Sequence, residues 1–286
     1  ANIYLRLDNC TEAIENFDKV LKIKNDYFQA HQGKAIAYKK LFKFKESIEE
    51  WQKVYQYNPG NTHALVQSGN LLFDTNRLDE ALKAYTDAFQ IEPEKPFLLG
   101  NIIHTKSKMC AWNNYEKDLS NFKKDILENK KVSSPYVTLT LFDDPKIHLA
   151  AAKVWSNEYS KKNNQEDNNE IIKNQKKDKI RIGYYSADFR THAMGHLLVR
   201  MFELHNKEKF EIYGFYFGPT IKKDDELSKR IISSFDKYID VSNKNDGEIV
   251  ELTKSIGIDI AVDLMCFTGN NNRFGIFTKK MCTSTN

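Results

Sequence analysis

The chain has 286 residues, of which 41% are hydrophobic and 29% are charged, a composition typical of a folded protein with a sizeable core. At this length about two domains are expected. The 43 basic and 39 acidic residues leave a formal net charge of only +4, which argues against nucleic acid as a partner. The sequence contains neither an apolar run approaching the ~18 residues of a membrane span nor an N-terminal signal pattern, so a membrane partner is not expected either.

The four cysteines, Cys10, Cys110, Cys266 and Cys282, are widely spaced and form no CxxC pair. Histidines do not stand at metal-ligand spacing from them, so neither a zinc site nor a disulfide framework is expected. Reduced thiols of this kind favour a cytoplasmic location. The chain lacks an initial Met and opens directly on a helical pattern, so we expect a piece of a longer protein.

A period of 34 residues runs through the first third of the chain. Small residues recur at Ala13, Ser47 and Ala81, aromatic residues at Phe17, Trp51 and Tyr85, and closing residues at Asn25, Pro59 and Pro93. This is the tetratricopeptide pattern, in which small residues let two helices cross closely and a turn ends each unit. The sequence therefore predicts tetratricopeptide repeats over residues 1–93. Because the first unit begins part-way through its first helix, further repeats are expected before it.

Stacked helix pairs of this kind form a superhelix with a concave groove. A groove of this shape suits acceptor proteins or peptides, and we take protein binding as the main interpretation of the repeats. The alternative is a spacer or a dimerisation arm. The pattern leaves the oligomeric state open, a homo-oligomer included.

Residues 94–160 keep a helical periodicity but lose the strict register, which predicts a helical transition region. Turns are expected at 134–135 and at 143–145, the second leading into a helix over 146–159. Trp112 and Trp155 are expected as core anchors of this region. The segment 161–178 is almost wholly polar and cannot bury enough apolar surface to order itself, so it is expected to be a linker.

Strand and helix patterns alternate over residues 179–286, which predicts a parallel, doubly wound α/β lobe. Strands are expected over 180–185, 210–217, 237–241 and 258–264, and helices over 196–205, 225–235 and 246–255. The last strand is almost continuously apolar, as in a strand buried on both faces. A GxGxxG loop does not follow the first strand, so a dinucleotide-binding fingerprint is not predicted.

Candidate functional residues follow the first strand, because ligands of such sheets bind at the carboxyl ends of the strands. His192 could donate a hydrogen bond to a phosphate or sugar hydroxyl, or act as a base near neutral pH. Asp188 has two interpretations, a catalytic carboxylate or a cap of the following helix. His192 and His196 share a helix face, but without a third ligand a metal site is not expected. His205 is expected as a favourable charge at a helix end.

The order of these blocks resembles a known family. The repeats are followed by CAW, SP and DDP, then by IRIGYYSADFRTHAMGHLL, FEIYGFYFG, FDKYIDV and GIDIAVDL. Over residues 1–277 the chain resembles the O-linked N-acetylglucosamine transferase family and its SPINDLY-like relatives (glycosyltransferase family 41), in particular the bacterial-type members. The resemblance implies the GT-B arrangement of two Rossmann-like lobes, with residues 179–286 belonging to the first.

The resemblance also implies a reaction and its participants. The family moves a sugar from UDP-N-acetylglucosamine, or from GDP-fucose in the relatives, to Ser or Thr hydroxyls of intracellular proteins, with the repeats guiding the acceptor. No cofactor beyond this donor is expected, and N-acetylglucosamine is the first expectation for the sugar.

Four site residues are suggested by the resemblance. The family's histidine after the SxDF turn lines the cleft and is needed for activity, and it matches His192. Asp188 and His196 belong to the same motif, and Thr268 matches the end of the family's GYT segment, which reads CFT here. These three are expected to help bind the substrate.

The sequence departs from the family after residue 277, where it reads TKKMCTSTN and ends. None of its residues matches the second lobe, which in the family holds the nucleotide and its diphosphate, so this chain alone is expected to be truncated and inactive. The alternative is a tetratricopeptide interaction scaffold with a degenerate α/β appendage. A third reading, another kind of nucleotide-binding protein joined to the repeats, is disfavoured by the missing Gly-rich loop.

Overall fold

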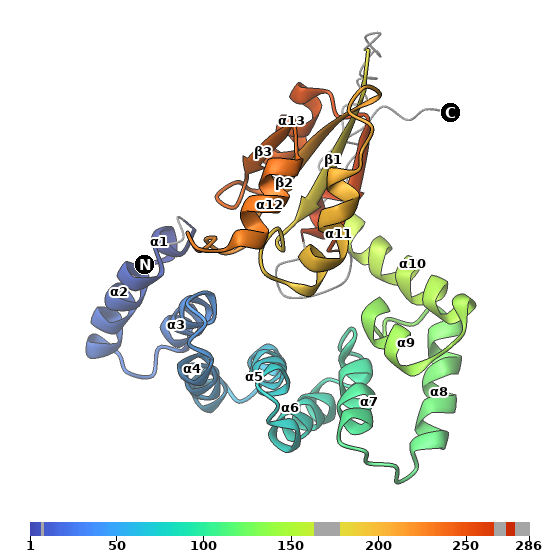
Figure 1. Ribbon diagram of the computed structural model, residues 1–286. Coiled ribbons are helices and arrows are strands. Elements are labelled where there is room, and N and C mark those ends of the chain that lie inside the picture. Colours follow the sequence, from blue (N-terminus) through green and yellow to red (C-terminus); the bar gives the residue numbers. More distant parts are fainter. Residues whose placement is uncertain (7–8, 163–177, 266–272, 278–286) are drawn as a thin grey trace. The chain divides into compact units, whose positions relative to one another are not determined.

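The structure is a computed structural model, and it describes residues 1–6, 9–162, 178–265 and 273–277 (Figure 1). The chain divides into two compact units, Ala1–Trp155 and Ser156–Asn286. The first is helical and the second contains a sheet, so each is described by itself. Within the described ranges, every helix is too short or too polar to span a membrane.

The helical unit is a series of helices of which the first eight pack each on the next along the chain, and Figure 1 shows the helices following an arc. The helices are α1 (Asn2–Arg6), α2 (Cys10–Ile23), α3 (Phe28–Lys40), α4 (Phe44–Tyr57), α5 (Thr62–Asp74), α6 (Leu78–Ile91), α7 (Leu98–Lys108), α8 (Tyr115–Leu127), α9 (Pro135–Leu141) and α10 (Pro145–Lys162). The closing residues Asn25, Pro59 and Pro93 lie in the turns between helix pairs. The prediction of helical repeats is therefore confirmed.

Neighbouring helices come close where an aromatic ring of one covers a glycine of the other. A Cβ added to Gly33 in α3 would stand 2.1 Å from the ring of Phe17 in α2. A Cβ added to Gly69 in α5 would stand 2.6 Å from the ring of Tyr85 in α6. Both distances are far below van der Waals contact, so glycine is what lets these helix pairs pack at this separation.

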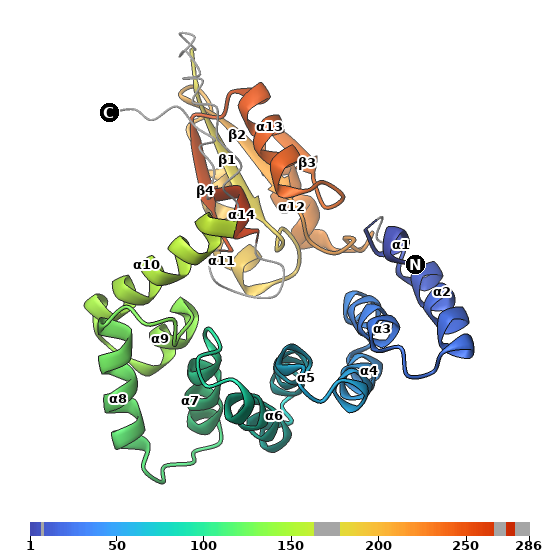
Figure 2. The ribbon, with the colours of Figure 1, turned by 180° about the vertical axis from the view of Figure 1, so that it is seen from behind.

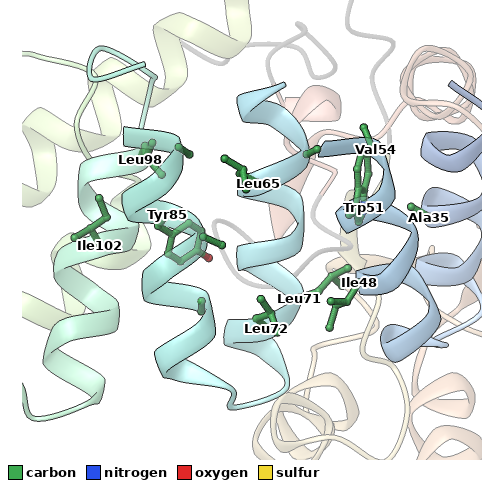
Figure 3. Packing of buried hydrophobic residues seen from close by; sticks show 14 residues of the cluster. Ala35, Ile48, Trp51, Val54, Leu65, Leu71, Leu72, Tyr85, Leu98 and Ile102 are labelled. Atoms are coloured by element: carbon green, nitrogen blue, oxygen red, sulfur yellow. The ribbon is translucent and has the colours of Figure 1, made fainter. Parts of the chain in front are cut away.

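One apolar core runs through five consecutive helices of this unit (Figure 3). Its labelled members in the figure are Ala35, Ile48, Trp51, Val54, Leu65, Leu71, Leu72, Tyr85, Leu98 and Ile102. Each helix contributes a few side chains that become buried only when its neighbour is in place. This is how a stack of repeats gains stability from nearest-neighbour contacts.

A second core joins the helices after the repeats, around Phe122 in α8, Val137 in α9 and Ile147 in α10. Trp155 is half-buried, with its ring centroid 4.6 Å from that of Phe97. Trp112 is 57% exposed, so the expectation that it anchors the core is wrong. It lies in the turn between α7 and α8, where a side chain belongs to neither helix's buried face.

The second unit contains a four-stranded parallel sheet, which confirms the α/β prediction. The strands are β1 (Ile180–Ser186), β2 (Phe210–Tyr216), β3 (Lys237–Asp240) and β4 (Ile260–Asp263), in the order β3-β2-β1-β4. The helices are α11 (Ala193–Glu203), α12 (Glu226–Ser234), α13 (Asp246–Ile256) and α14 (Phe274–Phe277). Because β1 is central, its carboxyl end emerges between two neighbouring strands.

Helices cover both faces of this sheet, as Figures 1 and 2 show from opposite sides. On one face α11 and α12 pack on β1 and β2 through a cluster that includes Phe189, Phe202 and Phe235. On the other face α13 and α14 pack on a cluster that includes Tyr185 and Phe215, whose rings stack with centroids 4.4 Å apart. The doubly wound arrangement follows from these two apolar layers.

The expectation that the last strand is buried on both faces is wrong. In the described sheet β4 pairs with β1 alone and forms an edge, and Ile260 is 46% exposed. The strongly buried Ile258 precedes the strand and belongs to the core beneath α13. A continuous apolar run therefore marked a strand correctly, but it did not reveal how many neighbours the strand has.

Candidate active site

The strand order fixes where a ligand would meet this sheet. From β1 the chain proceeds to β2 and β3 on one side, then returns to place β4 on the other side of β1. The direction of winding thus reverses between β1 and β4, where Tyr185 pairs with Asp263. In open α/β sheets, ligands bind outside the carboxyl ends of the strands at such a point. The loop 187–192, which follows β1, lies at this position.

The loop 187–192 is folded tightly against the end of the sheet. The hydroxyl of Ser186 accepts a hydrogen bond from the Asp188 amide at 2.9 Å, which makes a tight turn. The Phe189 ring is fully buried against Phe202 and Phe235. Ala187 and Asp188, before this ring, are also buried, whereas Thr191 and His192, after it, are exposed.

His192 begins helix α11 as its N-cap. Its extended backbone precedes the first helical turn, and its Nδ1 accepts a hydrogen bond from the Met194 amide at 3.3 Å. The side chain is 42% exposed, and Nε2 has no hydrogen-bond partner among the described residues. With Nδ1 accepting, the proton of a neutral ring is on Nε2. His192 can therefore donate a hydrogen bond to a ligand.

Asp188 lies beside His192 but does not cap the helix, so that interpretation is wrong. Its carboxylate is 3.0 Å from Nη2 of Arg190 and 3.5 Å from Nδ1 of His192. Asp188 is only 8% exposed, whereas the capping group is His192 itself. At 3.5 Å the carboxylate is within ion-pair distance of the ring, while the hydrogen bond at Nδ1 comes from the Met194 amide.

His196 lies one helical turn after His192, as the spacing predicted, and its amide donates to the His192 carbonyl at 3.1 Å. Its side chain is exposed and has no partner in the described part of the chain. Three or more metal-ligating side chains do not come together anywhere in the described ranges. Thr268, the fourth expected residue, lies outside the described residues.

His205 is not the charged helix-end residue that the sequence suggested. It follows α11, and its Nε2 shares a 2.8 Å hydrogen bond with the Tyr184 hydroxyl. Burial, and then the nearby Lys207, lower the pKa of His205 below its usual value. A ring that prefers the neutral form contributes no charge to the helix end at neutral pH.

Sequence reasoning missed Arg190 and Asp225. The guanidinium of Arg190 pairs with Asp188, while its Nε is buried and has no hydrogen-bond partner in the described structure. Asp225 comes from the loop after β2 and binds Thr191, the residue before His192. The only sequence signal for Asp225 was its place before a helix, which indicates a cap and not a role at another strand's loop.

The family model for glycosyl transferase family 41 matches residues 109–282, more than half of the chain. The chain belongs to this family. A tetratricopeptide repeat model matches residues 62–95, which cover α5 and α6. The match to family 41 includes the whole β1 loop described above.

Two similar proteins agree with this assignment. A probable UDP-N-acetylglucosamine–peptide N-acetylglucosaminyltransferase SEC of Arabidopsis thaliana is 31% identical over 90 residues, which are 32% of this chain and 9% of that protein. A mutant of the O-GlcNAc transferase from Thermobaculum terrenum has a similar fold, with a TM-score of 0.59 and 18% identity. The alignment covers 99% of this chain and 47% of that one. The chain thus spans less than half the length of either protein.

Proposed function

We propose that this protein takes part in transferring N-acetylglucosamine from UDP-N-acetylglucosamine to Ser or Thr hydroxyls of other proteins in the cytoplasm. The observation that carries the proposal is His192, which is half-exposed at the carboxyl end of the central strand of a family 41 domain. The names of the two similar proteins support N-acetylglucosamine as the sugar. GDP-fucose is the competing donor, and the test below separates the two.

In such a transfer, the acceptor oxygen forms a bond to the anomeric carbon while the bond from that carbon to the diphosphate breaks. Negative charge gathers on the departing diphosphate, which takes up the proton that the acceptor hydroxyl loses as its oxygen forms the new bond. Groups that meet this charge with preplaced hydrogen-bond donors lower the barrier. With its Nδ1 occupied by the Met194 amide, His192 offers Nε2–H as such a donor. We assign His192 to donor binding and charge stabilisation.

Asp188 and His196 are proposed to help bind the substrate from either side of His192. Asp188 holds Arg190 and lies near Nδ1 of His192, so it sets the charge around the ring. His196 adds a second exposed imidazole one turn along α11. Thr268 is proposed for the same role on the sequence motif alone.

The helical unit is proposed to bind the acceptor protein. Tetratricopeptide repeats are protein-interaction modules, and here they form one continuous stack. A stack that presents a long surface can guide segments of different proteins toward a single catalytic loop.

The test is sugar transfer measured with His192→Gln and, as its matched control, His196→Gln. Transfer of labelled sugar to protein Ser or Thr is followed with UDP-N-acetylglucosamine and with GDP-fucose. Both this chain and the full gene product are assayed. We expect the full gene product to transfer sugar from UDP-N-acetylglucosamine and this chain alone to transfer none, with a loss of roughly 10²–10³-fold in kcat for His192→Gln of the full gene product. His196→Gln, which removes a proposed binding contact, should raise KM and lose much less in kcat.

Two results would contradict the proposal. Full activity of His192→Gln would remove the residue that carries it. Absence of transfer from either donor, together with protein binding by the helical unit, would favour the interaction scaffold instead. Transfer from GDP-fucose alone would keep the reaction class and correct the sugar.

A further inference from the structure

We infer that Asp225 is a positioning residue, which fixes His192 for the reaction by holding the residue before it. The inference rests on the proposed role of His192. Asp225 lies 33 residues after His192 along the chain, in the loop that follows β2. Its contacts cross from that loop to the loop after β1.

Both oxygens of the Asp225 carboxylate bind Thr191. Oδ2 accepts the Thr191 backbone amide at 2.8 Å, and Oδ1 accepts the Thr191 hydroxyl at 2.8 Å. Oδ1 also accepts the amide of Ser228 at 2.9 Å, which caps helix α12. A carboxylate that holds both the amide and the hydroxyl of one residue restricts its backbone and its side chain together. The peptide unit between Arg190 and Thr191 is thereby fixed, and with it the residue directly before His192.

This contact depends on the ionised carboxylate. Burial alone would raise the pKa of Asp225, but the hydrogen bonds from Thr191 and Ser228 outweigh it and hold the pKa well below its usual range. The charged form, with two accepting oxygens, is therefore the one present near neutral pH. In Asp225→Asn, an NH2 group would replace one of the two oxygens and would face a donor of Thr191 or Ser228.

Two other close contacts hold the same loop, so Asp225 completes a frame. A Cβ added to Gly195 would stand 2.6 Å from the Arg190 carbonyl oxygen, which shows how closely the loop approaches α11. A Cβ added to Gly218 would stand 2.2 Å from the Ala187 carbonyl oxygen. The loop is thus held by its own helix at Gly195 and by the β2 loop at Gly218 and Asp225.

A helix cap alone would not need these contacts, as a second cap in the same unit shows. Asn245 caps α13: its side-chain oxygen accepts the Glu248 amide at 3.0 Å, and the Glu248 carboxylate accepts the Asn245 amide at 2.7 Å. That arrangement is local to one helix end. Asp225 makes the equivalent cap bond and adds two bonds to another loop.

The experiment compares Asp225→Ser with Asn245→Ser. Serine keeps an oxygen for capping a helix but is too short to hold both donors of Thr191. A second pair, Thr191→Val and Thr191→Ser, removes or keeps the hydroxyl at an exposed position. These Thr191 substitutions at the surface leave the apolar core intact, so they test the inference even where Asp225→Ser does not fold.

The first readout needs no activity. In the isotope-labelled chain, nuclear magnetic resonance follows hydrogen exchange of the residue 191 amide and the ring signals of His192, assigned with His192→Gln. Asp225→Ser should speed amide exchange by about tenfold or more and shift the His192 signals. Thr191→Val should shift those signals, whereas Thr191→Ser and Asn245→Ser should leave them in place. Unchanged exchange and unchanged ring signals in Asp225→Ser would overturn the inference.

The second readout is transfer by the full gene product. Asp225→Ser should lower kcat by roughly ten- to a hundredfold with little change in KM for the donor, because a displaced catalytic group weakens the transition state more than binding. Asn245→Ser should keep its kcat. If His192 moves while kcat is unchanged, the positioning role is wrong. If the unchanged protein transfers no sugar, the proposed function fails, and the resonance readout still decides whether Asp225 holds His192.

Discussion

Each unit contains a histidine beside a carboxylate, and the two differ in how fully their hydrogen bonds are satisfied. In the helical unit, the carboxylate of buried Glu50 lies 2.5 Å from Nδ1 of His31. The same carboxylate lies 3.0 Å from Nζ of Lys34 and 3.1 Å from Nζ of Lys53. The second ring nitrogen of His31 lies 3.0 Å from the Asn25 carbonyl. Both ring nitrogens of His31 therefore have a hydrogen-bonding partner. Lys34 also pairs with Asp18 of α2 at 2.9 Å, so the cluster joins α2, α3 and α4.

In the α/β unit, His192 uses one nitrogen for the Met194 amide and stays 42% exposed. Neighbouring Arg190 has a buried Nε without a partner in the described structure. An incomplete set of bonds next to an exposed ring leaves groups available to a ligand, whereas the completed set around Glu50 does not. These two histidine–carboxylate clusters therefore differ in the satisfaction of their hydrogen bonds and not in residue type.

The largest effect is expected from Glu50→Gln. Burial alone would raise the pKa of Glu50, but His31 and Lys34 lower it, so the carboxylate is charged, and Glu50→Gln leaves the buried Lys34 with only Asp18 as its partner. Breaking such a buried pair lowers the free energy of unfolding by about 3–5 kcal/mol. Urea unfolding followed by tryptophan fluorescence measures this, because all three tryptophans of the chain lie in the helical unit.

Lys53→Gln is the matched control, since Lys53 binds the same carboxylate but its side chain is 43% exposed. Exposed partners contribute at most about 1 kcal/mol. If Glu50→Gln and Lys53→Gln lowered the unfolding free energy equally, the buried contacts of Glu50 would not be what stabilises the helical unit.

The frame of the second cluster is tested by Gly195→Ala. The added Cβ would meet the Arg190 carbonyl oxygen at 2.6 Å, and a backbone atom cannot rotate away. We expect a loss of about 1–3 kcal/mol, as for overpacking, together with altered ring signals of His192. Hydrogen exchange of the α11 amides measures the loss.

Gly60→Ala serves as the control, because an added Cβ there has no neighbour within 4 Å. It should be neutral or stabilise the helical unit by up to about 1 kcal/mol. If Gly195→Ala were as harmless as Gly60→Ala, the loop before α11 would not be closely packed against that helix.

The sequence predicted the repeats and the alternation of strands and helices because both follow local rules. Each repeat carries its own small residue, aromatic residue and turn. The pattern can therefore be recognised from residues such as Phe17, Trp51 and Tyr85 without information on distant contacts. The strand preceding His192 was equally plain, since a buried parallel strand reads as an apolar run.

What could not be predicted depends on contacts between distant segments. The edge position of β4 is set by strand order, which an apolar run does not encode. The exposure of Trp112 depends on the direction in which a turn leaves the helices. The bond between Asp225 and Thr191 exists because parallel pairing of β1 and β2 brings their following loops together. The completeness of bonding around His31 and His192 is likewise a property of the folded chain.

A smaller effect is expected from Asn245→Ala, which removes the local cap of α13. The side chain accepts the Glu248 amide, and its loss leaves that donor at the helix end without its partner. Loss of such a cap costs about 1 kcal/mol. Hydrogen exchange of the α13 amides measures it, and the His192 signals should not move. Movement of those signals would mean that the loops at this edge are coupled beyond Asp225.

The smallest effect is expected from His104, which should make the unfolding free energy of the helical unit depend on pH. His104 is less buried than His31 and less exposed than His192. His104 is half-buried, with its ring 5.1 Å from that of Phe73, and burial, followed by Lys108, lowers its pKa. In the unfolded chain His104 takes up a proton near its usual pKa of about 6.5. In the folded unit it does so only at a lower pH. The stability contributed by the neutral ring is therefore complete above that pH and is lost as the pH falls below it.

The lost stability is measured by repeating the urea unfolding at several pH values between 7.5 and 5.5, for the unchanged protein and for His104→Gln. Removing the titrating ring should flatten the fall in unfolding free energy over this window. His63, whose pKa is also lowered by burial and then by Lys95, should retain a smaller share of the slope. If His104→Gln did not change the slope of unfolding free energy against pH, the proton would be taken up by another group. In that case burial would not affect proton uptake by the half-buried histidines of this unit. His31 would then differ from them only in its hydrogen bonds to Glu50 and Asn25.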